Sequence, residues 1–262
     1  MKDGFQESNM VALLDRSEIS IAASSALTNL LPSAEIAGFP GKAAANVTHA
    51  PRSLQPDQKT SAYGRFGKRV LDLCLVAISL PVALPVILLS AIALWFESGL
   101  PFYRQKRLGE HGSVFHLLKL RTMVRDADGM LERVLADDPQ MRAEWDATQK
   151  LKNDPRITHV GAFLRATSLD ELPQLWNVLT GEMSLVGPRP MMPDQLPLYG
   201  DPQAYFAVKP GITGLWQVSA RNENRFDYRC QVDAAYFQSI SLWTDAAIMF
   251  RTVGVVARRT GY

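Results

Sequence analysis

The sequence contains little cysteine and little histidine. Its two cysteines are too few for a disulfide framework. Its four histidines are scattered, without the i, i+4 or cysteine-paired spacing of a metal site. The sequence also lacks a glycine-rich phosphate-binding loop and a serine nucleophile elbow. The templates of zinc enzymes, P-loop enzymes and serine hydrolases are therefore excluded.

Charge of either sign is not in surplus. The 262 residues include 28 Lys and Arg against 26 Asp and Glu, so the overall charge gives no indication of nucleic-acid binding. A chain of this length forms either one large domain or a smaller domain with appendages. Residues 1–62 are rich in Ala, Ser, Pro and Asn and show no apolar periodicity. We expect them to form a disordered N-terminal extension.

A long apolar run follows this extension. The segment "LCLVAISLPVALPVILLSAIALWF" contains no charged residue and exceeds the roughly 20 residues that span a bilayer. Pro81 and Pro85 lie in its middle, and each removes a backbone donor. Basic residues flank the run on both sides, whereas a spanning helix carries them mainly on its cytoplasmic side. We therefore predict that residues 63–98 form a proline-broken re-entrant helix; an ordinary kinked transmembrane helix is the alternative.

The remainder, residues 99–262, has the composition of a water-soluble catalytic domain. "PFYRQKRL" and "SVFHLLKL" predict two strands joined by a turn, with Lys119 and Arg121 on one face. We expect one long charged helix over residues 125–151 and an irregular loop with some extended backbone over residues 210–222. The apolar face of residues 241–259 suits a helix on a membrane surface, or one packed on the core. The predicted fold class is α+β, mostly helical, with a small β-hairpin and interfacial amphipathic helices.

Two adjacent carboxylates, Asp170 and Glu171, mark a predicted helix start. Ser168 and Glu171 have the spacing of a capping box, and Pro173 is tolerated only in a first turn. The positive end of a helix favours anions, so we expect Asp170 to be ionised at neutral pH. Acidic residues are common in first helical turns, however, and a purely structural role is the alternative.

Cations in the neighbouring sequence favour a chemical role for this pair. Arg165 precedes the helix and Arg189 follows it in a Gly-Pro-Arg-Pro loop. An ionised aspartate among cations is typical of a site where a carboxylate attacks phosphorus. Adjacent helical residues point about 100° apart, so Asp170 and Glu171 should have different functions. One would be the nucleophile and the other would hold Mg²⁺, the usual metal partner of phosphate.

Several segments resemble one known family. They are "KRVLDL", the proline-containing apolar run, "LKLRTM", "KNDPRIT", "LRATSLDELPQLWNVLTGEMSLVGPRP" and "KPGITGLWQVSARN". Over residues 65–262 the chain resembles the bacterial sugar transferases that start exopolysaccharide synthesis, the monotopic polyprenyl-phosphate phosphoglycosyl transferases. The short form is most similar to succinoglycan-type galactose- or glucose-1-phosphate transferases. The family's Ser-Pro helix break is altered here, since Leu84 precedes Pro85.

The resemblance implies a reaction, a location and a set of site residues. A hexose 1-phosphate would pass from a UDP-hexose to undecaprenyl phosphate with release of UMP, through a sugar-phosphoryl-aspartate. This would occur among inner-membrane lipids on the cytoplasmic face of the bacterial inner membrane, with Mg²⁺ and without nucleic acid; a homodimer and the identity of the hexose are left open. The implied catalytic residues are Asp170, Glu171, Arg165 and Lys119, with Glu171 and Asp170 as metal ligands. The implied phosphate-binding residues are Arg121, Arg189 and Arg221. The candidates for a loop that binds the nucleotide are Pro188, Gly214, Gln217 and Asn222.

Two other functions are compatible with the same residues. A lipid-linked glycosyltransferase acting directly at the anomeric carbon would release UDP in place of UMP. A non-enzymatic membrane scaffold would recruit polysaccharide-assembly partners, although such a protein has no need for clustered carboxylates and cations.

Overall fold

The computed structural model describes residues 62–148, 151–219 and 226–257. The disorder predicted for the N-terminal extension thus falls almost wholly outside the described residues. Within those ranges the chain is mostly helical, with two small two-stranded sheets. One helix, Tyr63–Ser98, is long and apolar enough to cross a membrane.

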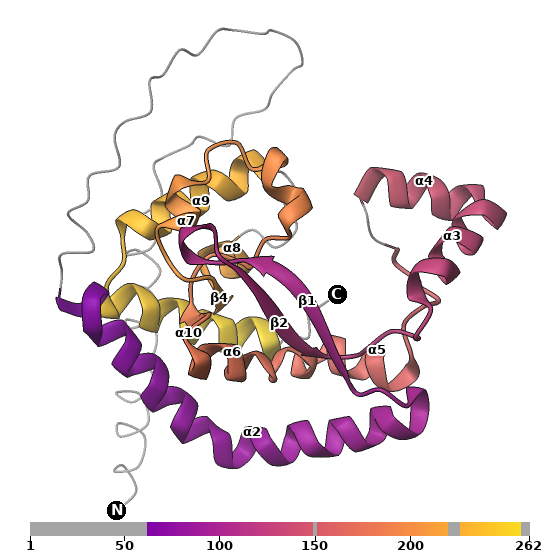
Figure 1. Ribbon diagram of the computed structural model, residues 1–262, viewed down its shortest axis with the longest axis horizontal. Helices are drawn as coiled ribbons and strands as arrows, with labels where there is room; N and C mark the ends of the chain where they lie inside the picture. Colours follow the sequence, from indigo (N-terminus) through magenta and orange to yellow (C-terminus); the bar gives the residue numbers. More distant parts are fainter. Residues whose placement is uncertain (1–61, 149–150, 220–225, 258–262) are drawn as a thin grey trace, which may run out of the picture. The chain divides into compact units, whose positions relative to one another are not determined.

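The apolar run forms helix α2, Lys68–Ser98, after a π-helical turn at Tyr63–Gly67. At 1.5 Å per residue its 31 residues extend about 46 Å. Pro81 and Pro85 lie inside the helix without interrupting it, so the predicted break is instead a change of direction, visible midway along α2 in Figure 1. The bend follows from the proline rings, which clash with the preceding turn and remove backbone donors. Gly99 ends α2 in the left-handed conformation, with φ at 82°.

The predicted hairpin is confirmed. Strands β1, Phe102–Leu108, and β2, Val114–Leu120, pair antiparallel around a 3-10 turn at Glu110–Gly112. Phe115 and Leu117 point into the core with α2 residue Val76. Asn177 holds the outer edge of β2: its Oδ1 accepts from the Leu118 N–H at 3.0 Å, and its Nδ2 donates to the His116 carbonyl at 2.9 Å.

The prediction of one long helix over residues 125–151 is wrong. The structure has two helices there, α3, Ala127–Asp137, and α4, Pro139–Thr148. A residue before proline disfavours the helical conformation, and Asp138 is extended, with φ −123° and ψ 104°. Its Oδ1 accepts from the Gln140 and Met141 N–H groups, which caps α4.

Short elements build the remainder of the domain. Two three-residue strands, β3 (Ser184–Val186) and β4 (Gly211–Thr213), pair in parallel. Strands this short show no alternation, so the sequence does not predict their pairing. The predicted loop at residues 210–222 includes β4 and helix α8. The elements are α5 (His159–Ala166), α6 (Gln174–Thr180), β3 (Ser184–Val186), a 3-10 segment (Pro193–Leu198), α7 (Gln203–Phe206), β4 (Gly211–Thr213), α8 (Leu215–Ser219), α9 (Phe226–Gln238) and α10 (Leu242–Ala257).

Helix α10 has one buried face and one exposed apolar face. Ile248 and Asp245 are buried, whereas Trp243, Phe250 and Val253 are exposed. The core-packed alternative therefore describes one side of this helix, and the apolar face predicted for a membrane surface lies in part on the other.

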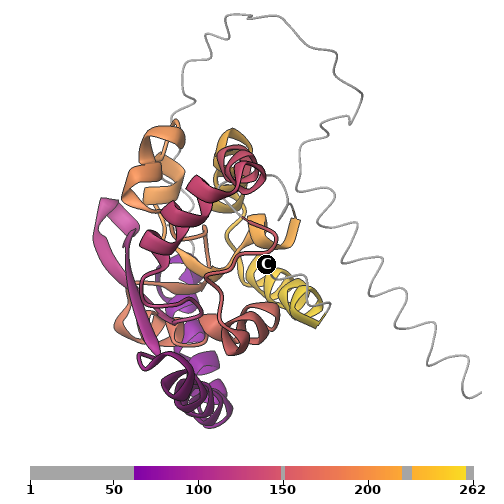
Figure 2. The same cartoon turned by 90° about the vertical axis from the view of Figure 1, so that its right-hand side faces the viewer.

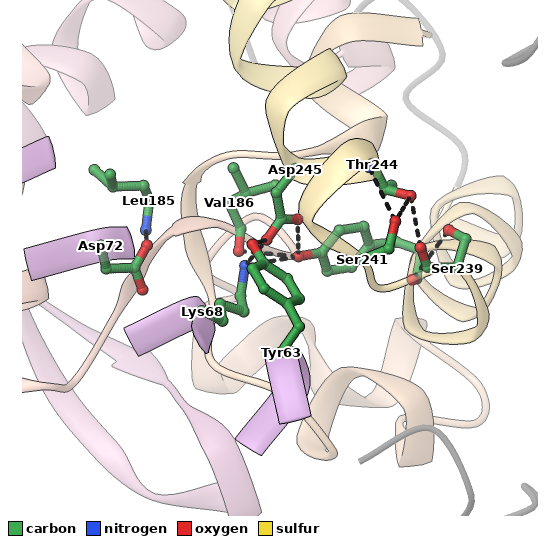
Figure 3. A network of polar contacts seen from close by, with 10 residues as sticks. Tyr63, Lys68, Asp72, Leu185, Val186, Ser239, Ser241, Thr244 and Asp245 are labelled. Carbon is green, nitrogen blue, oxygen red and sulfur yellow. Dashed lines mark hydrogen bonds and ion pairs between the residues drawn. The ribbon is translucent and has the colours of Figure 1, made fainter. Parts of the chain in front are cut away.

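Both ends of α2 are attached to the same domain. At the N-terminal end, the Lys68 ammonium donates to Asp245 Oδ2 at 2.6 Å and to the Tyr236 hydroxyl at 3.0 Å. Figure 3 shows this network, in which the Tyr63 hydroxyl also donates to Asp245. At the other end, the Val160 N–H donates to Glu97 at 3.1 Å. In the two perpendicular views α2 lies along one edge of the domain (Figures 1 and 2).

Candidate functional site

The acidic pair lies in a tight turn between two helices. Helix α5 ends at Ala166, a 3-10 turn covers Leu169–Glu171, and α6 begins at Gln174 with Pro173 as its N-cap residue. The capping box predicted for Ser168 is absent: Ser168 is left-handed, with φ at 56°, and its side chain makes no cap bond. The carboxylates therefore precede the short helix α6 and do not occupy its first turn.

Lys119 reaches the second carboxylate of the pair. Its Nζ donates to Glu171 Oε1 at 2.8 Å, in an ion pair whose side chains are about one-fifth and one-quarter exposed. The register Tyr103↔Lys119 places this lysine on the inner face of the hairpin. Partial burial strengthens the pair relative to a surface salt bridge.

The pKa of Asp170 reflects burial more than a helix terminus. Burial raises this pKa to about 6; the ammonium of Lys119 lowers it, the charge of Glu171 raises it, and Arg165 lowers it. Asp170 is therefore largely ionised at neutral pH, as predicted, but it becomes protonated close to pH 6.

Arg165 is the second cation at this turn. It projects from the last turn of α5, and its Nε donates to Thr122 Oγ1 at 2.7 Å. Burial lowers the pKa of Arg165, while the carboxylate of Asp170 raises it. The bond to buried Thr122 fixes the guanidinium beside the acidic pair.

A small pocket opens next to the ion pair. It contains two more cations, Arg107 and Arg189, and two amides, Gln174 and Gln217. Gln217 is buried, and its Oε1 has no hydrogen-bond partner among the described residues. The lining residues are Arg107, Leu117, Lys119, Glu171, Gln174, Arg189, Pro190, Ile212 and Gln217.

Three predicted site residues have other surroundings. Arg121 lies over the Tyr103 ring, 5.6 Å from its centroid, and does not line the pocket. The carbonyl of Pro188 accepts from the Gly211 N–H at 2.8 Å. A Cβ atom at Gly214 would lie 2.0 Å from the Gly187 carbonyl oxygen. Pro188 and Gly214 therefore lie where the segments after β3 and around β4 pack closely against each other. Arg221 and Asn222 lie outside the described residues.

Two polar residues that line the pocket, Arg107 and Gln174, are not among the site residues predicted from the sequence. Arg107 occupies the strand face that carries Lys119, because its cross-strand partner Phe115 is four residues from that lysine. The hairpin register would have identified it, but flanking basic residues were interpreted only as membrane-topology signals. Burial, and to a smaller extent the charge of Arg189, lower the pKa of Arg107 to about 10.

A buried polar cluster supports the Gly-Pro-Arg-Pro loop from behind. The Arg229 guanidinium donates to the Arg189 carbonyl and lies 3.8 Å from Asp233. The Tyr199 hydroxyl donates to the same carboxylate. Burial raises the pKa of Asp233 to about 6, while Arg229 and Tyr199 lower it. The backbone of Arg189 is thereby held while its side chain faces the pocket.

Comparisons with known proteins agree with these motifs. The family model described as bacterial sugar transferase matches residues 63–259. The chain is 50% identical over 198 residues to a UDP-galactose-lipid carrier transferase of Erwinia amylovora; the aligned region covers 75% of this chain and 42% of the relative. It is 43% identical over 200 residues to the exopolysaccharide production protein ExoY of Rhizobium meliloti, covering 76% of this chain and 88% of that protein.

A third relative has a more specific name. The chain is 40% identical over 199 residues to a UDP-glucose:undecaprenyl-phosphate glucose-1-phosphate transferase of Caulobacter vibrioides, covering 71% of this chain and 68% of the relative. The match spans less than half the length of several relatives, including those of Erwinia amylovora and Salmonella typhimurium. Since the family model matches about three quarters of the sequence, the chain belongs to the bacterial sugar transferase family.

Proposed function

We propose that the protein transfers a hexose 1-phosphate from a UDP-hexose to undecaprenyl phosphate and releases UMP, as the first membrane step of exopolysaccharide synthesis. The observation that carries this proposal is the partly buried pair Asp170 and Glu171 beside the cations Lys119 and Arg165. The names of the relatives indicate the substrates: a UDP-sugar and undecaprenyl phosphate.

In the first step, a carboxylate oxygen of Asp170 attacks the β-phosphorus of the sugar nucleotide. The bond between that phosphorus and the bridging oxygen breaks, and the electron pair leaves with UMP. The product on the enzyme is a sugar-phosphoryl-aspartate. Ionised Asp170 needs no base, and its pKa of about 6 keeps it nucleophilic at neutral pH.

In the second step, an oxygen of undecaprenyl phosphate attacks the same phosphorus. The acyl-phosphate bond breaks, Asp170 is released as a carboxylate, and the product is undecaprenyl-diphospho-hexose. In both steps Lys119 and Arg165 stabilise the negative charge on the transferred group, which is the main contribution of a protein to phosphoryl transfer.

The donor set is compatible with Mg²⁺. Among the described residues no group of three or more His, Cys, Asp or Glu could hold a metal ion, whereas Mg²⁺ in phosphate enzymes commonly takes one or two carboxylates together with substrate oxygens. Glu171 and Asp170 would provide these carboxylates. When bound, Mg²⁺ would neutralise charge on the diphosphate. Glu171, now paired with Lys119, would exchange that partner for the metal.

We further propose that α2 enters the membrane without crossing it, from the cytoplasmic face of the inner membrane. Contacts at both ends support this topology: Lys68 bonds to Asp245, and Glu97 accepts from Val160. A straight spanning helix would leave its two ends on opposite sides of the bilayer. The outward-facing residues of α2, including Ile78, Val82 and Leu88, are exposed and apolar. The bilayer would cover them.

Cysteine labelling tests the topology. In a background that lacks Cys74 and Cys230, single cysteines at the exposed positions Ala62 and Ser113 should both react with an impermeant maleimide only from the cytoplasmic side. Labelling of these two positions from opposite sides would establish a spanning helix.

The reaction is tested by its first product. Purified protein incubated with UDP-glucose or UDP-galactose, Mg²⁺ and a polyprenyl phosphate should release UMP, and Asp170→Asn should abolish release while leaving the protein in the membrane. UDP as product would indicate direct glycosyl transfer. Absence of both products across a panel of sugar nucleotides would favour the scaffold.

A further inference from the structure

Arg107 and Lys119 project from one face of the hairpin, toward different ends of the pocket. In the antiparallel register Lys119 faces Tyr103, and Arg107 is four residues further along β1, about 13 Å at 3.3 Å per residue. Both line the same pocket. Two long cationic side chains with this separation can contact different phosphate groups of one ligand.

The Arg107 side chain is held in place but retains unused donors. One terminal nitrogen donates to the Pro190 carbonyl at 2.9 Å, and the other donates to Gln105 Oε1 at 2.5 Å. Its Nε is buried and has no partner among the described residues. A guanidinium has five N–H donors in a rigid fork that matches phosphate oxygens. The group is therefore oriented for an acceptor that the part of the chain described by the structure does not supply.

The charge around Arg107 is also uncompensated. None of the ion pairs among the described residues includes it. Besides burial, the cations Arg189 and Arg229 lower the pKa of Arg107, whereas the hydroxyl groups of Tyr205 and Tyr103 raise it; Arg229 itself lies near Asp233. Holding two partly buried guanidinium groups together without a carboxylate is unfavourable. A bound anion between Arg107 and Arg189 would remove the cost.

We propose that Arg107 and Arg189 form a second phosphate-binding subsite, which holds the phosphate that departs with the nucleoside. This subsite is separate from the position beside Asp170 and Lys119 where phosphorus is transferred. The proposal rests on the proposed function, because it assigns the two phosphates of a sugar nucleotide to two groups of cations.

The hairpin indicates which phosphate occupies the subsite. Strand β1 begins just after α2 ends, so the Lys119 end of the pocket is close to the apolar helix along which a lipid would arrive. Arg107 lies near the turn, which packs against α7, and Gln217 borders the pocket from α8. Arg107 is therefore farther along the hairpin from the C-terminal end of α2 than Lys119 is, which favours the nucleoside phosphate over the lipid phosphate at this subsite.

Paired titrations with UMP and uridine test the subsite on the purified full chain. The two ligands differ only in the phosphate, so the ratio of their dissociation constants isolates its contribution. Arg107→Met should weaken UMP binding about 10-fold or more, the loss expected for a hydrogen-bonded charged group. Uridine binding should change less than about twofold, and Arg107→Lys, which keeps the charge without the fork, should be intermediate. The matched control Lys106→Met, on the exposed face of the same strand, should bind both ligands as the wild type does.

Steady-state kinetics distinguish the two sources of phosphate. Arg107→Met should raise the KM for the UDP-sugar and leave the KM for polyprenyl phosphate unchanged. A rise in the lipid KM with unaltered UMP binding would overturn the assignment to the nucleoside. Equal weakening of UMP and uridine would show that Arg107 only supports the loop through Pro190. If the wild type releases UMP but Arg107→Met binds UMP normally, the subsite is rejected and the proposed function stands. If the wild type neither binds nor releases UMP, the proposed function is rejected as well.

Discussion

Replacing the proposed nucleophile should make the protein more stable. An unfolded aspartate has a pKa of about 4, and burial raises that of Asp170 to about 6. Folding therefore disfavours the charged form, and the difference of about two pH units corresponds to about 3 kcal/mol. Asp170→Asn keeps the shape and removes the charge. We expect it to gain up to about 3 kcal/mol at pH 7.5, or about 6–12 °C in Tm for a domain of this size.

The pH dependence provides the sharper measurement. A group whose pKa is raised by folding stabilises the folded state fully below its unfolded pKa, and that stability is lost as pH rises through the folded value. Thermal unfolding of wild type and variant in the same detergent should therefore coincide below about pH 4. The two curves should separate between about pH 4 and 6 and stay parallel above. Burial also raises the pKa of Asp233 to about 6. Because Asp233 is present in both proteins, its contribution cancels from the difference between the two curves.

A matched control is available on α3. Asp128 is exposed, and Asp128→Asn should change stability by less than about 0.5 kcal/mol at every pH. If Asp170→Asn is no more stable than the wild type at pH 7.5, or if their difference does not vary with pH, the burial of Asp170 does not disfavour its charge. The reasoning about its nucleophilicity would then be refuted with it.

Three further predictions concern activity and the architecture. The rate of UMP release should rise with pH and reach half its plateau near pH 6, because only ionised Asp170 attacks; a profile that is flat between pH 5 and 8 would exclude it as the titrating nucleophile. Asn177→Leu should cost about 1–3 kcal/mol, since the Leu118 N–H loses its acceptor; denaturant unfolding measures the loss, and an unchanged midpoint would contradict this function of the amide. Lys68→Met should cost about 3–5 kcal/mol by leaving Asp245 buried without its cation, and the added change Asp245→Asn should recover part of it; no recovery in the double variant would show that the charge is not the cause.

The sequence could identify the features that depend on neighbouring residues. An uncharged apolar run predicts a long helix by composition alone, and alternation around a Gly-Glu-His-Gly turn predicts the hairpin; both are present as α2 and β1–β2. The adjacent carboxylates and the Gly-Pro-Arg-Pro loop are likewise visible as letters. Their nearness in the sequence favours one site for phosphate chemistry, and the order of motifs, which resembles a family, supports the same site.

Local patterns failed where a single residue or a distant segment decides the conformation. Pro139 divides a stretch whose charge pattern is helical throughout. Ser168 has the spacing of a cap, but its backbone lies in the left-handed region and its side chain makes no cap bond. The strands β3 and β4 are too short to show a period, and each exists because the other supplies its hydrogen bonds.

The components of this protein can be recognised from its residues alone: one apolar helix, one hairpin, two adjacent carboxylates and several cations. The folded arrangement is needed to show which cations meet which carboxylates, that Arg107 shares a pocket with Lys119, and that burial raises the pKa of Asp170 to about 6. The physical reason is that burial and electrostatic interaction depend on distances between segments far apart in the chain, and no local pattern of residues records those distances.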